Sequence, residues 1–127
     1  TALPQSHLFK VDLRSNKWPA QMEGPFDRIL SGYTFHEFTD AYKISLLFRL
    51  AHESLSSEGL IVIGDISYRT TISFEQAHQE LKGFWDEDEY YWCAERMIPK
   101  LEEIGFNVDY KQVSACGGIY RLQGKIK

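Results

Sequence analysis

The chain has 127 residues, of which 43% are hydrophobic and 25% are charged, a composition typical of a single globular domain spanning residues 1–127. Its net charge of −4 argues against a broad nucleic-acid surface, because phosphate binding needs clustered lysine and arginine. Its apolar stretches fall far short of the ~20 residues that cross a bilayer. Two cysteines are too few for a disulfide framework, so we expect a protein of the reducing cytoplasm that contacts no membrane.

Two short strands are predicted near the start of the chain. His7–Leu13 resembles a strand that stops at a polar turn. An irregular connection follows, marked by Trp18-Pro19 and Gly24-Pro25. Phe26–Gly32 is predicted to be the second strand, and it ends in small and aromatic residues.

A helix followed by an apolar strand is the clearest pattern. Between Asp40 and Ser56, apolar residues recur at helical spacing, and Thr39 or Asp40 can cap the first turn. Leu60–Ile63 is then an unbroken apolar run between glycines, which is typical of a strand buried on both faces. Such strands occur in parallel sheets covered by helices, so the pattern predicts an α/β fold.

The rest of the chain predicts helices and a terminal hairpin. Ser73–Gln76 fits a capping box that starts a helix ending near Lys82. The acidic run Asp86–Glu89 is interpreted as a solvated helix start, and Asp88–Ile104 as a helix that Pro99 either kinks or divides. Phe106–Val113 and Ile119–Gln123, joined by a glycine-containing turn, predict an antiparallel hairpin. An ordinary doubly wound fold has no such hairpin.

Four segments, in this order, resemble class I S-adenosylmethionine-dependent methyltransferases. Val11–Leu13 (VDL) resembles the acidic end of the family's third strand, and Phe26–His36 (FDRILSGYTFH) resembles its fourth strand. Leu55–Ile63 (LSSEGLIVI) and Glu103–Phe106 (EIGF) resemble the approaches to strands five and six. The resemblance implies a mostly parallel Rossmann-like sheet with helices on both faces and a C-terminal antiparallel hairpin. It also implies S-adenosyl-L-methionine as the cofactor.

The family's glycine-rich loop and the acidic end of its second strand have no counterpart, since no Gly-x-Gly occurs in the sequence. By resemblance these parts would precede Thr1, so we expect a truncated domain that binds the cofactor poorly by itself. Without the family's first strand, one edge of Phe26–Gly32 would be unpaired. We therefore expect the chain to re-pair through a homodimer, a swapped segment or a shifted His7–Leu13 strand.

Cofactor contacts are expected at two places. By resemblance, the carboxylate of Asp12 accepts from the adenine amino group, and the backbone N–H of Leu13 meets a ring nitrogen. The alternative is an aspartate that only caps its turn. Ser31, Gly32 and Tyr33 follow a strand at the edge where open α/β sheets bind ligands, although an ordinary strand end explains them equally well.

The acceptor site has four candidate residues. His36 is the candidate general base or pocket residue, with a local hydrogen-bonding histidine as the alternative. Asp65 and Tyr68, after the apolar strand, and Tyr91, in an aromatic run, are candidate acceptor contacts, although a polar strand end and helix packing also explain them. The other histidines, His7, His52 and His78, lack metal-ligand spacing, so no metal is expected.

The leading hypothesis is a methyltransferase that acts on a small molecule. The acceptor itself cannot be read from the sequence, because methyl transfer needs mainly alignment and a dry pocket. The alternative is a non-catalytic methyltransferase-like module that serves dimerisation or partner binding. A short dehydrogenase is disfavoured by the terminal hairpin and by the absence of a Tyr-x-x-x-Lys pair.

Overall fold

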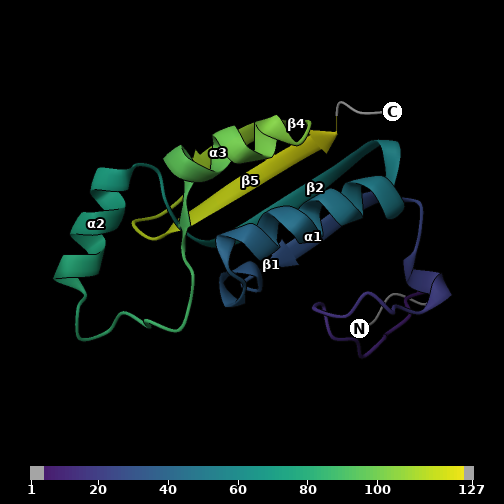
Figure 1. The fold of residues 1–127 in the computed structure, drawn as a ribbon, viewed down its shortest axis with the longest axis horizontal. Helices are drawn as coiled ribbons and strands as arrows, with labels where there is room; N and C mark the ends of the chain where they lie inside the picture. Colours follow the sequence, from purple (N-terminus) through teal and green to yellow (C-terminus); the bar gives the residue numbers. More distant parts are fainter. Residues whose placement is uncertain (1–4, 125–127) are drawn as a thin grey trace.

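Five strands form a mixed sheet in the computed structural model, which describes residues 5–124 (Figure 1). Across the sheet lie β1 (Phe26–Gly32), β2 (Leu55–Tyr68), β5 (Gly117–Gly124) and β4 (Phe106–Gln112), in that order. The two-residue β3 (Trp92–Cys93) pairs with the end of β2. Strands β1 and β2 are parallel, whereas β5 is antiparallel to β2 and β4. The predicted α/β sheet with a C-terminal antiparallel hairpin is therefore confirmed.

The crossover between β1 and β2 is the predicted helix, α1 (Asp40–Glu53). Thr39 caps it, since its hydroxyl oxygen accepts from the backbone N–H of Tyr42 at 3.2 Å. The helix ends three residues before the predicted Ser56, because the chain joins the sheet at Leu55, which pairs with Phe26. Backbone pairing with β1 thus replaces the last helical turn.

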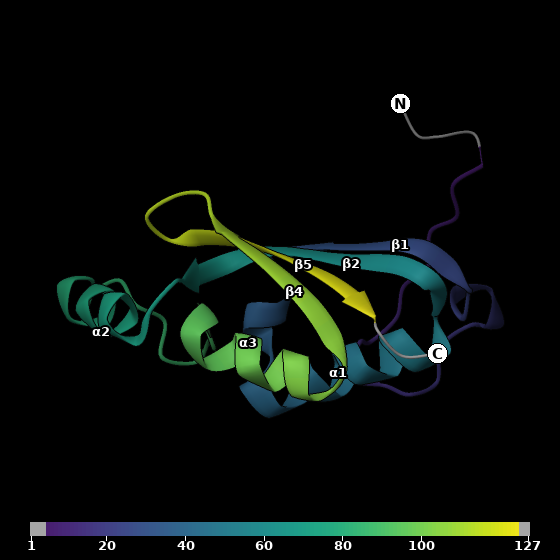
Figure 2. The ribbon, with the colours of Figure 1, turned by 90° about the horizontal axis from the view of Figure 1, so that it is seen from above.

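The core lies on one side of the sheet, where α1 and α3 (Ala94–Glu103) both pack (Figure 2). On β2, Ile61 and Ile63 face these helices and are 1% and 0% exposed, while Val62 on the opposite face is partly exposed. Leu60–Ile63 therefore lies mid-sheet as predicted, but its burial is deepest on one face. Helices on the second face, which the resemblance implied, are not found within residues 5–124: α1 and α3 lie on the same side of the sheet, and α2 lies beyond its end (Figure 2).

The predicted strand at His7–Leu13 is wrong. The segment has no regular structure and ends in a turn, where the carbonyl of Asp12 accepts from the N–H of Ser15 at 2.9 Å. A strand needs a neighbour to satisfy its backbone groups, and no strand in the described range pairs with this segment. Leu13 and Trp18 instead pack side chains against the core. The unpaired edge of β1 is therefore not covered by a shifted His7–Leu13 strand.

Helix α2 (Thr71–Glu80) begins three residues before the predicted Phe74. The capping box exists, but Thr70 is its first member and Ser73 its second. The N–H of Ser73 donates to the Thr70 hydroxyl oxygen at 3.0 Å, and the N–H of Thr70 donates to the Ser73 hydroxyl oxygen at 3.1 Å. Reciprocal capping by Thr70 outweighs the one-sided cap that Ser73 would provide.

The predicted helix over Asp88–Ile104 is shorter in the structure, where α3 begins at Ala94. Trp92 and Cys93 are extended because they pair with Ser67 and Tyr68 as β3. Pro99 lies within α3, and the helix stops before Gly105, whose φ of 109° suits glycine. No helix within residues 5–124 has the length and apolar character needed to cross a membrane.

Candidate functional site

The carboxylate of Asp65 is the centre of a buried polar cluster at the end of the parallel strands. Its Oδ1 lies 2.7 Å from Nδ1 of His36 and accepts from the N–H of Ile66 at 2.8 Å. Its Oδ2 accepts from the backbone N–H of His36 at 2.8 Å and from Trp92 Nε1 at 3.0 Å. A carboxylate only accepts hydrogen bonds, so we assign the imidazole hydrogen to Nδ1. Nε2 then carries the lone pair of the ring.

A tight turn after β1 brings His36 to Asp65. Tyr33 adopts a left-handed φ of 52° and donates its N–H to the carbonyl of Gly64 at 2.9 Å. The 3-10 turn η2 (Phe35–Glu37) then carries His36 over β2, and the buried ring of Phe35 anchors this turn against Trp92. His36 and Asp65 were named separately from the sequence, and the structure brings them together.

Two further carboxylates face Nε2 of His36. Glu89 Oε2 lies 3.4 Å from it and Glu37 Oε1 lies 3.6 Å from it. The hydroxyl of Tyr91 donates to Glu89 Oε1 at 2.8 Å, and the N–H of Tyr90 donates to the carbonyl of His36 at 2.7 Å. Burial, followed by this bond to Glu89, raises the pKa of Tyr91 to about 12, so Tyr91 remains a donor near neutral pH. Tyr91, predicted to meet the acceptor, here orients Glu89.

Lys43 supports the loop that carries Glu89. Its fully buried Nζ donates to Asp40 Oδ1 at 2.9 Å and to the carbonyl of Tyr90, and it lies 4.9 Å from the ring centroid of Trp92. Burial lowers the pKa of Lys43 below its usual 10.5, although the charge and hydrogen bond of Asp40 oppose the shift.

Sequence reasoning missed both Glu89 and Lys43. Glu89 was interpreted as part of a solvated acidic run, and a helical lysine is usually taken as solvent-facing. One signal was present: Lys43 shares a helical row with Leu46, Leu47 and Leu50, which are buried.

Three of the five predicted cofactor residues meet in one groove. Leu13, Ser31 and Gly32 line a hollow of about 350 Å³ along β1, between α1 and the segment before β1. No atom lies within 4 Å of the position that a Cβ would occupy at Gly32, so the groove is open at this point. Its other lining residues are mostly apolar: Trp18, Met22, Phe26, Ile29, Leu30, Thr34, Phe35, Leu46, Leu50 and Ser54.

Three predicted site residues lie elsewhere. Asp12 is exposed, and its Oδ1 accepts from the N–H of Arg14 at 2.9 Å, which is the turn cap considered as the alternative. Tyr33 is 73% exposed. Tyr68 is buried, and its ring packs against Phe74 and Trp85 at centroid distances of 5.7 and 5.8 Å. The position of Tyr68 therefore favours packing between β2 and α2.

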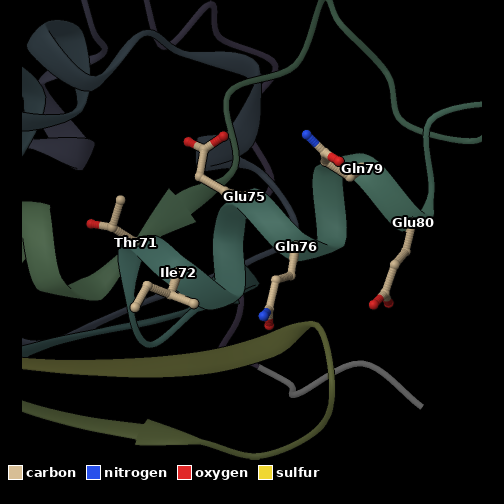
Figure 3. A pocket seen from close by; sticks show the side chains of 6 residues that line it. All are labelled: Thr71, Ile72, Glu75, Gln76, Gln79 and Glu80. Atoms are coloured by element: carbon tan, nitrogen blue, oxygen red, sulfur yellow. The ribbon is translucent and has the colours of Figure 1, made fainter.

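A second hollow, of about 450 Å³, runs along α2 alone (Figure 3). Its lining is Thr71, Ile72, Glu75, Gln76, Gln79 and Glu80, which project from successive turns of one helix. No residue of the His36–Asp65 cluster lines this hollow, so the candidate site stays at the end of β1 and β2.

The comparisons with known sequences point to one class of enzyme. No protein-family profile matches the chain. The chain is 34% identical over 98 residues to an uncharacterized methyltransferase of Geobacillus kaustophilus and 31% identical over 97 residues to one of Oceanobacillus iheyensis. These matches cover 72% and 71% of this chain but 45% of each relative. The chain therefore spans about half the length of the curated relatives it matches.

Solved structures share the fold. An O-methyltransferase family 2 protein from Planctomyces limnophilus, in complex with apigenin, matches 90% of this chain and 33% of its own, with a TM-score of 0.65 and 18% identity. Magnesium protoporphyrin IX methyltransferase from Synechocystis, with bound SAH, matches 91% of this chain and 49% of its own, with a TM-score of 0.58 and 13% identity. At these identities the likeness concerns the fold alone.

Replacing Asp65 with asparagine should destabilise the protein by about 2–4 kcal/mol, because an amide presents one acceptor oxygen to four donors and leaves buried N–H groups unpaired. Chemical unfolding of Asp65→Asn measures this loss. Asp109→Asn is the matched control, since Asp109 is exposed and lies 3.5 Å from Arg121, and it should cost less than about 1 kcal/mol. Equal losses in the two variants would contradict the central role of Asp65.

The lowered pKa of Lys43 predicts a specific pH dependence. Between the folded-state pKa and 10.5, the unfolded chain binds more protons than the folded one, so stability conferred by this site rises with pH. Guanidinium unfolding from neutral pH to 10.5 should show wild type gaining stability relative to Lys43→Met. The exposed Lys100→Met variant should track wild type. A constant difference between wild type and Lys43→Met over this range would refute the shift.

Proposed function

We propose that this chain, which has the class I S-adenosylmethionine-dependent methyltransferase fold, is part of an enzyme that transfers the methyl group of S-adenosyl-L-methionine to a small-molecule acceptor. The curated relatives are named methyltransferases, and two structural neighbours are named with bound SAH. The observation that carries the proposal is the His36–Asp65 pair at the carboxyl ends of β1 and β2. Open α/β sheets place their ligands at this edge.

We also propose that the described domain corresponds to the C-terminal half of the fold. The chain covers 45% of its curated relatives, and no Gly-x-Gly sequence occurs in it. Within the described range, one edge of β1 has no partner strand. Cofactor affinity of the 127-residue chain alone should accordingly be weak.

The groove along β1 supports a cofactor role for Leu13, Ser31 and Gly32. It combines apolar walls with an opening at Gly32, where the backbone can approach a ligand closely. These residues would hold part of S-adenosyl-L-methionine, which supplies a methyl group on a sulfonium leaving group when bound. Asp12 and Tyr33 do not line this groove, so a cofactor role is proposed only for the three residues that do.

The His36–Asp65 pair suits an acceptor that loses a proton during methyl transfer, such as a hydroxyl or amine. Asp65 holds Nδ1–H, so Nε2 carries the lone pair and can accept the acceptor's proton. Glu89 and Glu37, at 3.4 and 3.6 Å from Nε2, stabilise the imidazolium that results. The side chain of His36 is 10% exposed, which keeps this proton transfer away from bulk water.

We further propose a cytoplasmic location. Both cysteines are free thiols, with Cys93 buried and Cys116 exposed. A reducing compartment keeps an exposed thiol in this form.

The second candidate function is a non-catalytic methyltransferase-like module that forms a homodimer. The open edge of β1 favours it, because Leu30 on this strand is 74% exposed and Phe26 is 38% exposed. An unpaired apolar edge is a template for another chain.

Replacing His36 with asparagine in the longer protein that carries this chain tests the enzyme proposal. We expect kcat to fall by roughly 10²- to 10⁴-fold, the usual contribution of a general base, while S-adenosylhomocysteine binds as in wild type by calorimetry. His78→Asn is the matched control, since His78 pairs with Glu87 at the surface of α2, and its kcat should be unchanged. Absence of S-adenosylhomocysteine binding to the wild-type longer protein would eliminate the enzyme.

Sedimentation equilibrium of the 127-residue chain tests the module. A dimer that pairs through β1 should dissociate in Leu30→Lys, because the new charge lies on the exposed edge strand. Ile72→Lys, on α2, should leave the dimer intact, since Ile72 is 71% exposed, close to the 74% of Leu30, but lies far along the chain from β1. A wild-type monomer that is stable to dilution would exclude dimerisation through this edge.

A further inference from the structure

We infer that His36, Glu37 and Glu89 form a binding site for a divalent transition-metal ion. One ligand atom from each residue lies within 4.8 Å of the other two. The two separations from His36 Nε2, 3.4 Å to Glu89 and 3.6 Å to Glu37, are close to the ~3.3 Å expected between two ligands that share a tetrahedral ion at ~2.0–2.1 Å. Small side-chain movements would complete the coordination.

The groups that hydrogen-bond to these ligands are of the kind that orient metal ligands in proteins. A metal-bound histidine usually donates its other ring N–H to a carboxylate, and Asp65 Oδ1 lies 2.7 Å from His36 Nδ1. Glu89 is held in the same manner, because Tyr91 donates to its Oε1 and leaves Oε2 directed at His36. The site is thus oriented before any ion arrives.

The burial of the three ligands allows an ion to enter. The His36 side chain is 10% exposed, that of Glu89 is 23% exposed and that of Glu37 is 57% exposed. The Nε2 atom of the buried His36 therefore lies next to the exposed carboxylate of Glu37, and an ion can enter from that side. Three protein ligands leave one tetrahedral position for water or another molecule, as in exchangeable zinc sites.

The donor set selects the class of ion. One imidazole nitrogen with two carboxylates suits zinc and cobalt, whereas magnesium prefers oxygen ligands and retains its water. The sequence predicted no metal because its histidines lack metal-ligand spacing. Local spacing does not reveal this site, because its ligands come from η2 and from a loop about fifty residues later along the chain.

The inference goes beyond the proposed function and has a consequence for it. A metal ion at this site occupies Nε2 of His36, the atom that would accept the acceptor's proton. Zinc would therefore inhibit methyl transfer by competing for the base.

Calorimetric titration of the 127-residue chain with zinc chloride tests the site without cofactor or acceptor. The Cys116→Ser background removes the exposed thiol, which could bind zinc by itself. We expect one saturable site per chain, and a cobalt absorption spectrum that zinc displaces and excess magnesium does not. Zinc should also shift the NMR signals of the His36 ring.

Two substitutions test the site while leaving His36, and its hydrogen bond to Asp65, in place. Glu89→Gln should weaken zinc binding at least tenfold, and Tyr91→Phe should weaken it by about 10- to 100-fold, the usual effect of removing a group that orients a ligand. Circular dichroism verifies that both variants fold.

His78→Asn is the matched control, because His78 and Glu87 form a similar pair at 2.9 Å, and within residues 5–124 no third ligand of the His, Cys, Asp or Glu type completes a group with them. Zinc binding should be unchanged in it. Absence of saturable binding, or loss in His78→Asn but not in Glu89→Gln, would overturn the inference. Neither result affects the methyl-transfer test, because the kcat of His36→Asn is measured without added metal.

Discussion

The buried carboxylate of Asp65 is the constraint on which the rest of the site depends. A charge removed from water is costly unless it is fully hydrogen-bonded, and four N–H donors surround this one. The donors come from η2, from β2 itself and from β3, so three separate segments must meet for the fold to tolerate the charge. Satisfying Asp65 therefore places His36 and Trp92 at the end of the parallel strands.

The second support for this region is the fully buried Lys43 of α1. Its ammonium group connects Asp40 to the carbonyl of Tyr90, next to the loop residue Glu89. The helix that crosses from β1 to β2 thus also sets the position of a loop far along the chain. Two buried ionisable groups of opposite sign, Asp65 and Lys43, both contact Trp92. The polar site and the apolar core are consequently a single packing unit.

One set of side chains suits two kinds of chemistry. Asp65 orients the imidazole of His36, and Glu37 and Glu89 surround its remaining nitrogen with negative charge. That charge favours any cation at Nε2, whether the proton taken from an acceptor or a metal ion. The groove is mostly apolar and runs along β1 from Phe26 to Gly32, so it differs chemically from the polar centre at the carboxyl end of the strand.

Local patterns in the sequence determined β1, α1 and the terminal hairpin, because apolar periodicity, helix caps and glycine turns act over a few residues. They also indicated His36, Asp65 and Tyr91 one at a time. Only the tertiary structure decided that His7–Leu13 is not a strand, since strand formation requires a neighbour. It alone also decided that Lys43 is buried and that Glu89 meets His36, because burial of a charge depends on partners far apart along the chain.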